Sequence, residues 1–324
     1  MTKGTSEQGQ EVDGMSSRAA SWLAWSVCAV SLVLIAGSMV FLILNGGTVQ
    51  DWIFVGGMVS TAIVGGLVAS RRPGNPVGWF FVVSAASLAL QALTSEYAQY
   101  GLITDPGSVP AARALAWPQT WLWVPGIVLL LIFLPLCFPN GRLLSRRWRL
   151  VVWLAVALCV LAAVNTALLK KEADVNTGIA NPFAMEVPAT ALSLFETILE
   201  GLLTAVAVVS AMSLVVCFLR SRGVERQQMK WLAYAAALMP VLIILGYLTP
   251  SVDLATGLVF AVISVAVGIA VLRYRLYDID VIINRTLVYG SLTVLLALVY
   301  FGGERAARRS SAPSPAKSSS HKSP

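Results

Sequence analysis

Histidine is almost missing from this sequence of 324 residues, and that scarcity excludes several kinds of chemistry. The single histidine is His321, close to the end of a low-complexity segment. The chain therefore offers no Ser-His-Asp constellation, no histidine-based zinc site and no phosphoacceptor histidine in a helical setting. It also contains neither a Walker phosphate-binding loop nor a G-x-G-x-x-G fingerprint. We expect no enzymatic activity, no cofactor and no metal.

Charge is scarce as well. Charged residues make up 12% of the chain, against about 25% in soluble globular proteins, while apolar residues make up 57%. Nine stretches of 18 or more residues contain no Asp, Glu, Lys or Arg: 19–50, 52–70, 73–95, 114–141, 150–169, 201–219, 231–252, 254–272 and 286–303. Each is long enough to cross the hydrocarbon as a helix, which takes roughly 18–20 apolar residues. None alternates as a membrane strand would.

We therefore predict an all-α fold, a polytopic transmembrane helical bundle of about nine membrane segments. The multi-spanning domain covers residues 22–302, between a disordered cytoplasmic leader at 1–21 and a low-complexity basic tail at 303–324. Cysteine is also sparse, and Cys28, Cys137, Cys159 and Cys217 all lie inside apolar stretches without metal-binding spacing. A packing role is expected for them.

Lysine and arginine gather in alternate connections. The leader and the connections that contain Arg71, Arg142, Arg220 and Arg273 together carry 15 of these residues, and the opposite connections carry 3. Cytoplasmic loops concentrate Lys and Arg, so the N-terminus and the arginine-rich connections are predicted to face the cytoplasm. The predicted location is the cell membrane, with several passes through it.

Two of the stretches indicate how their helices pack. Glycine pairs at 56–57 and 65–66 in the second stretch predict close approach of neighbouring helices, although a flexible hinge is the alternative. The fourth stretch carries Pro118, Pro125, Pro135 and Pro139, which predict a kinked helix. Such a kink is either satisfied by neighbouring helices or lines a cavity, as in transporters.

Glu196 and Glu200 are the candidate sensing residues. They lie four residues apart at the edge of the sixth stretch, so a helix places them on one face near the outer membrane boundary. A carboxylate in lipid is unfavourable by a few kcal/mol, which favours a cavity or a partner and suggests a pair that responds to protons or cations. The alternative is a solvated helix start. The outward connections at 96–116 and 170–194 are too short to fold into a sensor domain.

Four segments at cytoplasmic boundaries carry a family resemblance: 71–79 (Arg-Arg-Pro-Gly-Asn-Pro-Val-Gly-Trp), 138–143 (Phe-Pro-Asn-Gly-Arg-Leu), 223–231 and 272–290. Their order and spacing over residues 20–302 resemble the multi-spanning N-terminal region of bacterial sensor histidine kinases common in actinobacteria and Chloroflexi. The region is also similar to orphan membrane proteins without a kinase. The resemblance implies that in the kinases this membrane region is followed by a phosphotransfer helix and an ATP-binding domain. Neither occurs in this sequence.

The last of these segments is the candidate output segment. Its residues are Arg273, Arg275, Asp278, Asp280, Asn284 and Arg285. Asp278 and Asp280 could suggest Mg²⁺, but the neighbouring arginines favour charge neutralisation. Asn284 is well placed as the N-cap of the ninth stretch.

The basic tail opposes the orientation rule, since five Lys or Arg residues follow the ninth stretch. Either that segment does not cross stably or the tail is a frameshift product; a genuine disordered tail is the alternative. The sequence is thus interpreted as a truncated input module of a two-component sensor kinase. The rivals are an orphan membrane protein that modulates a partner by association, and a small transporter or channel. The expected partners are the lipid bilayer and either a second copy of the chain or a partner sensor kinase, without nucleic acid.

Overall fold

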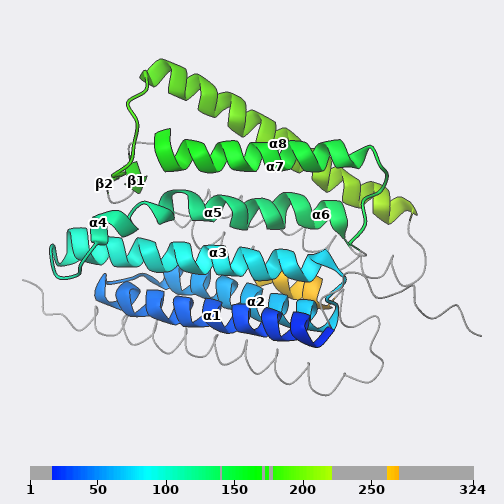
Figure 1. Cartoon of the computed structure of the whole chain (residues 1–324), viewed down its shortest axis with the longest axis horizontal. Helices are drawn as coiled ribbons and strands as arrows, with labels where there is room; N and C mark the ends of the chain where they lie inside the picture. The colour runs from blue at the N-terminus through cyan, green and yellow to red at the C-terminus, as the bar shows by residue number, and fades with distance from the viewer. Residues whose placement is uncertain (1–16, 139–140, 170–171, 175–177, 221–260, 270–324) are drawn as a thin grey trace, which may run out of the picture. The chain divides into compact units, whose positions relative to one another are not determined.

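Helices dominate the computed structural model (Figure 1). The structure describes residues 17–138, 141–169, 172–174, 178–220 and 261–269. The chain divides into two units, Met1–Leu276 and Tyr277–Pro324, and every described residue belongs to the first. Six described helices are long and apolar enough to cross a membrane: Arg18–Leu44, Asp51–Arg71, Pro76–Thr104, Ala112–Cys137, Trp148–Leu169 and Ala189–Arg220.

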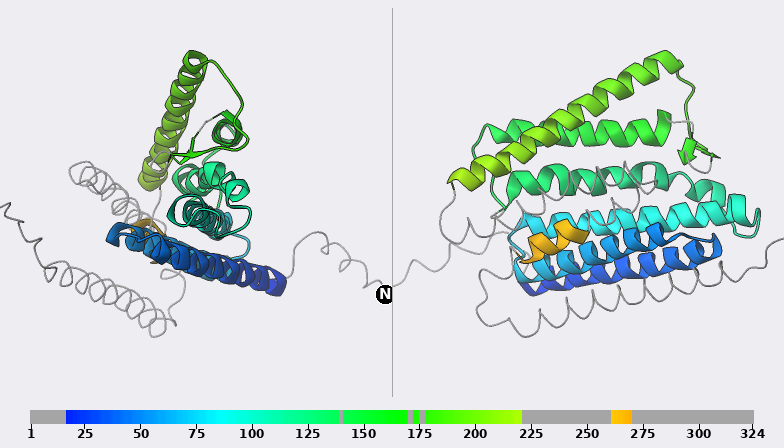
Figure 2. Two further views of the ribbon diagram at one scale, coloured as in Figure 1. Left: turned by 90° about the vertical axis from the view of Figure 1, so that its left-hand side faces the viewer. Right: turned by 180° about the vertical axis from the view of Figure 1, so that it is seen from behind.

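These helices match the first six predicted stretches and agree with an all-α membrane bundle. The count of nine segments is not confirmed. The seventh and ninth predicted stretches lie outside the described residues, and of the eighth only 261–269 is described, as a helix (Figure 2).

Three long helices form one side of the bundle. They are α1 (Ser17–Leu44), α2 (Val49–Arg71) and α3 (Pro76–Gln99), and each packs against the other two. The glycines of α2 allow this approach. A methyl group at Gly65 would lie 2.8 Å from the backbone nitrogen of Val82 in α3, and one at Gly66 would lie 3.0 Å from Cys28 Cβ in α1. Close packing, predicted from the glycine pairs, is confirmed at this pair.

The fourth span is broken where prolines predicted an interruption. It consists of α4 (Ala112–Leu115), α5 (Pro118–Val128), the π-helix η2 (Leu129–Phe133) and α6 (Leu134–Cys137). Because proline lacks an N–H group, Pro125 and Pro135 each remove one hydrogen bond from the helix.

Serine hydroxyls from two neighbouring helices bind carbonyl oxygens around this break. From α3, Ser84 donates to the Gly126 carbonyl at 2.7 Å and Ser87 to the Leu122 carbonyl at 2.5 Å. From α8 (Ala189–Arg220), Ser210 donates to the Ile132 carbonyl at 2.5 Å, and Ser213 lies 3.2 Å from the Pro135 carbonyl. The interrupted span is therefore held from two sides by its neighbours, which supports the interpretation that neighbouring helices satisfy the kink.

The remaining elements complete the described part of the chain. A π-helix, η1 (Tyr100–Thr104), ends α3, and another, η3 (Asn165–Leu169), ends α7 (Trp148–Val164). Two short antiparallel strands, β1 (Glu172–Asp174) and β2 (Ile179–Ala180), lie in the connection to α8. No strands were predicted there from the sequence.

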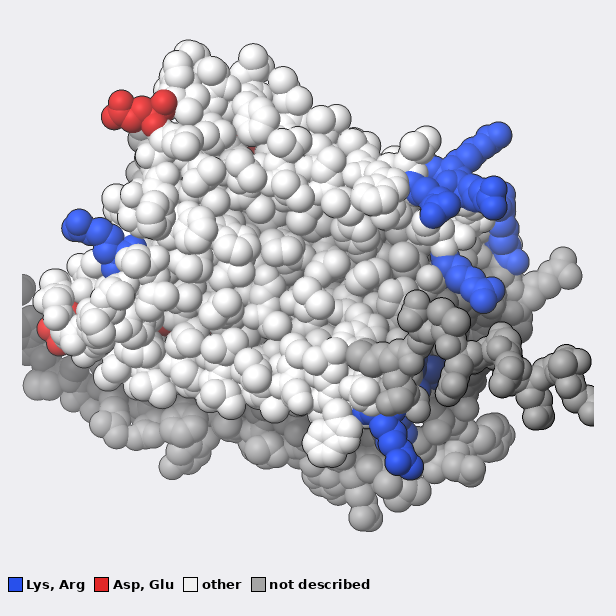
Figure 3. Space-filling model, in the orientation of Figure 1, with Lys and Arg blue, Asp and Glu red and all other residues white. Residues whose placement is uncertain are grey.

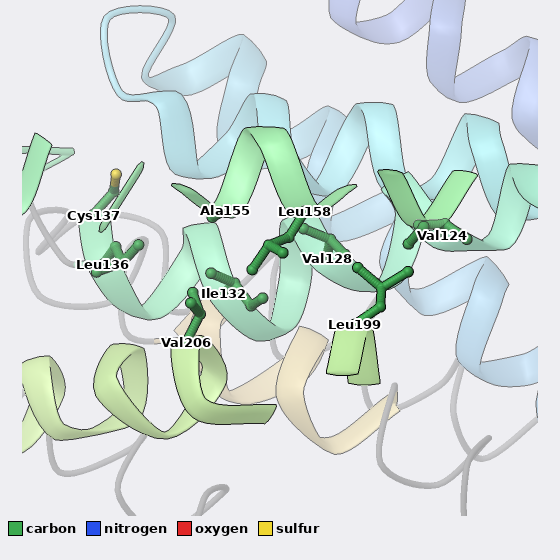
Figure 4. Packing of buried hydrophobic residues seen from close by; sticks show 10 residues of the cluster. Val124, Val128, Ile132, Leu136, Cys137, Ala155, Leu158, Leu199 and Val206 are labelled. Atoms are coloured by element: carbon green, nitrogen blue, oxygen red, sulfur yellow. The ribbon is translucent and has the colours of Figure 1, made fainter. Parts of the chain in front are cut away.

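A cluster of buried apolar side chains joins the fourth span to α7 and α8 (Figure 4). We call it the apolar cluster. Its members are Val124, Val128, Ile132, Leu136, Cys137, Ala155, Leu158, Ala162, Leu199 and Val206. It spans much of the length of α5 to α6.

The two ends of the described helices differ in charge (Figure 3). Successive helices run antiparallel, so the 71–75 and 138–147 connections share one end with the last turn of α8. That end, the arginine end, holds all the described Arg residues except Arg113. The opposite end, the acidic end, holds the described Asp and Glu residues together with Arg113. The charge segregation is the one expected of a membrane protein with basic connections on one side.

Candidate functional site

Glu196 and Glu200 lie well inside α8 rather than at its start. The helix begins at Ala189, so the two carboxylates come two to three turns later, at the acidic end. Glu196 is half-buried and accepts a hydrogen bond at 3.3 Å from the side-chain amide of Asn165 in η3. Glu200 is exposed. The structure thus brings Glu196 into contact with a neighbouring described helix.

Glu196 belongs to a set of polar side chains that closes one end of the apolar cluster. Trp121, Asn165 and Glu196 each lie three residues from a cluster member on the same helix: Val124, Ala162 and Leu199. A spacing of three keeps both side chains on one helix face. Since α7 is antiparallel to α5 and α8, all three polar residues lie toward the acidic end. We call them the polar rim.

Two atoms of the polar rim are buried without a hydrogen-bond partner in the described part of the chain. They are the indole nitrogen of Trp121 and the side-chain oxygen of Asn165, whose residue is 4% exposed. A buried polar atom without a partner is unfavourable by about 1–3 kcal/mol. The Asn165 side chain thus has one partner, Glu196, for its amide nitrogen and none for its oxygen in the described part of the chain.

The connection after η3 packs over α5 beside the rim. The indole N–H of Trp117 and the side-chain amide of Asn181 both donate to the Ala167 carbonyl, at 2.9 and 3.0 Å. The ring of Phe183 meets that of Trp117 edge-on, with centroids 5.4 Å apart. The described residues of this connection around Asn181 and Phe183 therefore pack against the start of α5.

A second polar contact at the acidic end joins α1 to α3. The side-chain amide of Asn45 donates to a carboxylate oxygen of Glu96 at 2.8 Å, and Thr104 donates to the amide oxygen of Asn45 at 2.7 Å. Sequence reasoning singled out neither this group nor Asn165. The available signal was an amide side chain at or near the end of an apolar stretch, where it needs a partner.

At the arginine end, two segments that carry the family resemblance lie against each other. Gly141 has a φ of +72°, and a methyl group there would overlap Pro76 and lie 2.9 Å from the Asn75 side-chain oxygen. Asn75 itself caps α3 by accepting from the Val77 N–H at 3.0 Å. The indole of Trp79 donates to the Pro73 carbonyl at 3.0 Å. In both segments, 71–79 and 138–143, these residues thus have structural roles: they shape two turns that pack against each other.

The candidate output segment, with Arg273, Arg275, Asp278, Asp280, Asn284 and Arg285, lies outside the described residues. The closest described residues before it form the helix at 261–269. In this helix Ser264 lies 2.8 Å from the Thr61 hydroxyl of α2, and both side chains are fully buried. A methyl group at Gly268 would lie 3.1 Å from a Val64 side-chain carbon of α2.

Metal binding finds no support in the described part of the chain, where no group of three or more His, Cys, Asp or Glu side chains could hold an ion. The four cysteines are free, and Cys28 and Cys137 are buried. The described residues of the polar rim present no nucleophile paired with a base. No protein-family model, curated protein or solved structure matches the chain.

Proposed function

We propose that this integral membrane protein is a sensory module, equivalent to the input region of a two-component sensor kinase, and that it works without catalysis. In this proposal a change at the polar rim alters how α8 packs against the fourth span and α7. The observation that carries it is the Asn165–Glu196 contact, which joins a half-buried carboxylate of α8 to a buried amide of η3.

The contacts along α8 support a path from this end to the other. Leu199 and Val206 belong to the apolar cluster, and Ser210 and Ser213 reach the carbonyls of the interrupted fourth span. A shift of α8 therefore changes both apolar packing and hydrogen bonds near η2. Packed interfaces of this kind adopt discrete arrangements rather than bending continuously.

A second set of contacts leads on toward the candidate output segment. Ser84 and Ser87 of α3 donate to carbonyls of the fourth span, and α3 packs closely on α2. In turn, α2 holds the helix at 261–269 through Thr61 and Ser264. Since that helix comes directly before the output segment in the chain, a movement of α2 would be passed to it. A transporter is less well supported. In transporters, free carbonyls of a broken helix bind the transported ion, whereas carbonyls of the interrupted fourth span accept hydrogen bonds from serine hydroxyls of α3 and α8.

The test measures movement at the arginine end after a change at the polar rim. Spin labels are placed on the exposed Gly74→Cys and Arg220→Cys in a full-length chain that lacks its native cysteines. The label-to-label distance is measured in lipid nanodiscs by pulsed electron paramagnetic resonance. We expect Glu196→Leu to shift the distance by about 1–2 Å, the usual size of helix displacements in switching proteins.

Glu200→Leu is the matched control, because Glu200 lies one turn along the same helix but is exposed. It should leave the distance unchanged. Identical distance distributions in the parent chain and both variants would contradict the proposed transmission.

A further inference from the structure

Arginines gather at the arginine end of the described bundle (Figure 3). We call it the arginine surface. Its members are Arg71, Arg72, Arg142, Arg146, Arg147, Arg149 and Arg220, and all are exposed except the half-buried Arg72. They come from three places in the chain: the end of α2, the connection before α7 together with the first turn of α7, and the end of α8. Several guanidinium groups are thus presented together.

The local fold places the connection that carries Arg72 beside the connection that carries Arg142. The turn at Gly141 lies against Asn75 and Pro76, which begin α3. Arg142 follows that glycine directly, and Arg72 lies three residues before Asn75. Because Asn75 is fixed as a helix cap, this contact sets how close the two basic connections are.

No described carboxylate shares this end with the arginines. The described Asp and Glu residues, all at the acidic end, are Asp51, Glu96, Asp105, Glu172, Asp174, Glu186, Glu196 and Glu200. The arginine surface therefore carries a positive charge that the described side chains do not neutralise. Anionic groups are its natural complement.

Exposed tryptophans near the arginine end indicate at what depth in the membrane the arginines lie, and so which anionic groups are beside them. Trp22 is 76% exposed and follows Arg18 by four residues, and Trp153 is 69% exposed and follows Arg149 by four residues. Tryptophan concentrates at the boundary between hydrocarbon and headgroups. With these tryptophans at that boundary, Arg18 and Arg149 of the same end would lie one turn farther out, at the depth of lipid phosphates, which the planar guanidinium group binds through paired hydrogen bonds.

We propose that the arginine surface binds the phosphate headgroups of anionic phospholipids in the adjacent leaflet. The partner is the lipid itself rather than an acidic protein, because the exposed Trp153 sets Arg149 at headgroup depth and the other arginines share its end of the bundle. Binding depends on charge at the membrane surface and weakens as salt screens it. The proposal does not depend on the sensory role suggested above.

The test uses tryptophan quenching of the full chain in vesicles of phosphatidylcholine mixed with phosphatidylglycerol. Either lipid is brominated in turn, so that quenching reports the relative association of each. We expect the chain to prefer phosphatidylglycerol about threefold or more at low salt, since each basic residue near an anionic surface contributes measurably to binding. The preference should fall toward one at about 0.5 M NaCl, where the screening length is only a few ångströms.

The variant Arg142→Gln/Arg146→Gln/Arg147→Gln should lose at least half of that preference, and the exposed positions of these residues should leave folding unchanged. Arg113→Gln, at the acidic end, is the matched control and should keep the full preference. Equal association of both lipids with the parent chain would overturn the proposal. So would a triple variant that keeps the parent preference. If the triple variant does not fold, the salt titration of the parent chain is the test: a preference for phosphatidylglycerol that does not fall with salt would contradict the proposal.

Discussion

At the scale of single residues, glycines at helix contacts set how closely the backbones approach. A methyl group at Gly78 of α3 would lie 2.5 Å from the Ala69 nitrogen and 2.9 Å from the Val68 carbonyl carbon, both backbone atoms of α2. Backbone atoms cannot move aside as the tip of a flexible side chain can. The approach of α2 and α3 therefore depends on the absence of a side chain at this position.

We predict that Gly78→Ala destabilises the protein by about 1–3 kcal/mol, the usual penalty for overpacking a core. Gly201→Ala is the matched control, since it is also a helical glycine but has no atom within 4 Å of the added methyl group. The control should be neutral or stabilising, because alanine favours helix. The melting temperature in detergent should thus fall for Gly78→Ala only. Equal melting temperatures for the two variants would contradict the packing argument.

The candidate sensing residues could be predicted from the sequence only in part. Charge inside a long helical pattern identified Glu196 and Glu200, and their spacing placed them on one helix face. It could not tell which of them is half-buried, because that depends on where α7 ends and how α8 crosses it. Asn165 lies in an uncharged stretch, so the charge pattern gave no reason to select it.

At the scale of elements, the interrupted fourth span depends on hydroxyl groups from its neighbours. We predict that Ser210→Ala destabilises the protein by about 1 kcal/mol, because the Ile132 carbonyl loses a buried donor. Ser193→Ala is the control, since Ser193 is exposed and bonds within its own helix to the Thr190 carbonyl. Thermal unfolding in detergent measures both. A loss no larger for Ser210→Ala than for Ser193→Ala would contradict the assigned role.

Prolines predicted the interruption of the fourth span, but not the π-helical form of η2. A π-helix depends on which carbonyls find partners outside the helix, and that requires the positions of α3 and α8. Likewise, the charge-free stretch beginning at Gly201 underestimated α8, which starts at Ala189. A helix can continue past the hydrocarbon, where charged side chains are tolerated. A stretch without charge therefore predicts the part of the helix that lies in hydrocarbon, and not where the helix begins.

At the scale of the whole molecule, the segregation of charge predicts an orientation. The side that carries Arg142 and Arg146 should face the cytoplasm. In a chain without native cysteines, Ser145→Cys should therefore resist an impermeant thiol reagent added to intact cells. Glu186→Cys, exposed at the acidic end, should react. Reaction of the cysteine at position 145 in intact cells would reverse the orientation.

The proposed role as a module without catalysis makes a biochemical prediction. The sequence offers no phosphoacceptor histidine in a helical setting and no recognisable nucleotide-binding loop. Purified full-length chain should therefore take up no label from radioactive ATP, whereas a complete sensor kinase treated in the same way should be labelled. Stable labelling of this chain in a preparation free of other kinases would contradict the proposed role.

The bond between Thr61 and Ser264 joins positions 203 residues apart, so it has a consequence for synthesis on the ribosome. At about 5–20 residues per second, Ser264 emerges roughly 10–40 s after Thr61. During that interval the Thr61 hydroxyl has a local partner, since it donates to the Gly57 carbonyl one turn back at 2.9 Å. The α2 helix can therefore enter the bilayer with the Thr61 hydroxyl already hydrogen-bonded, before the helix that contains Ser264 has been translated.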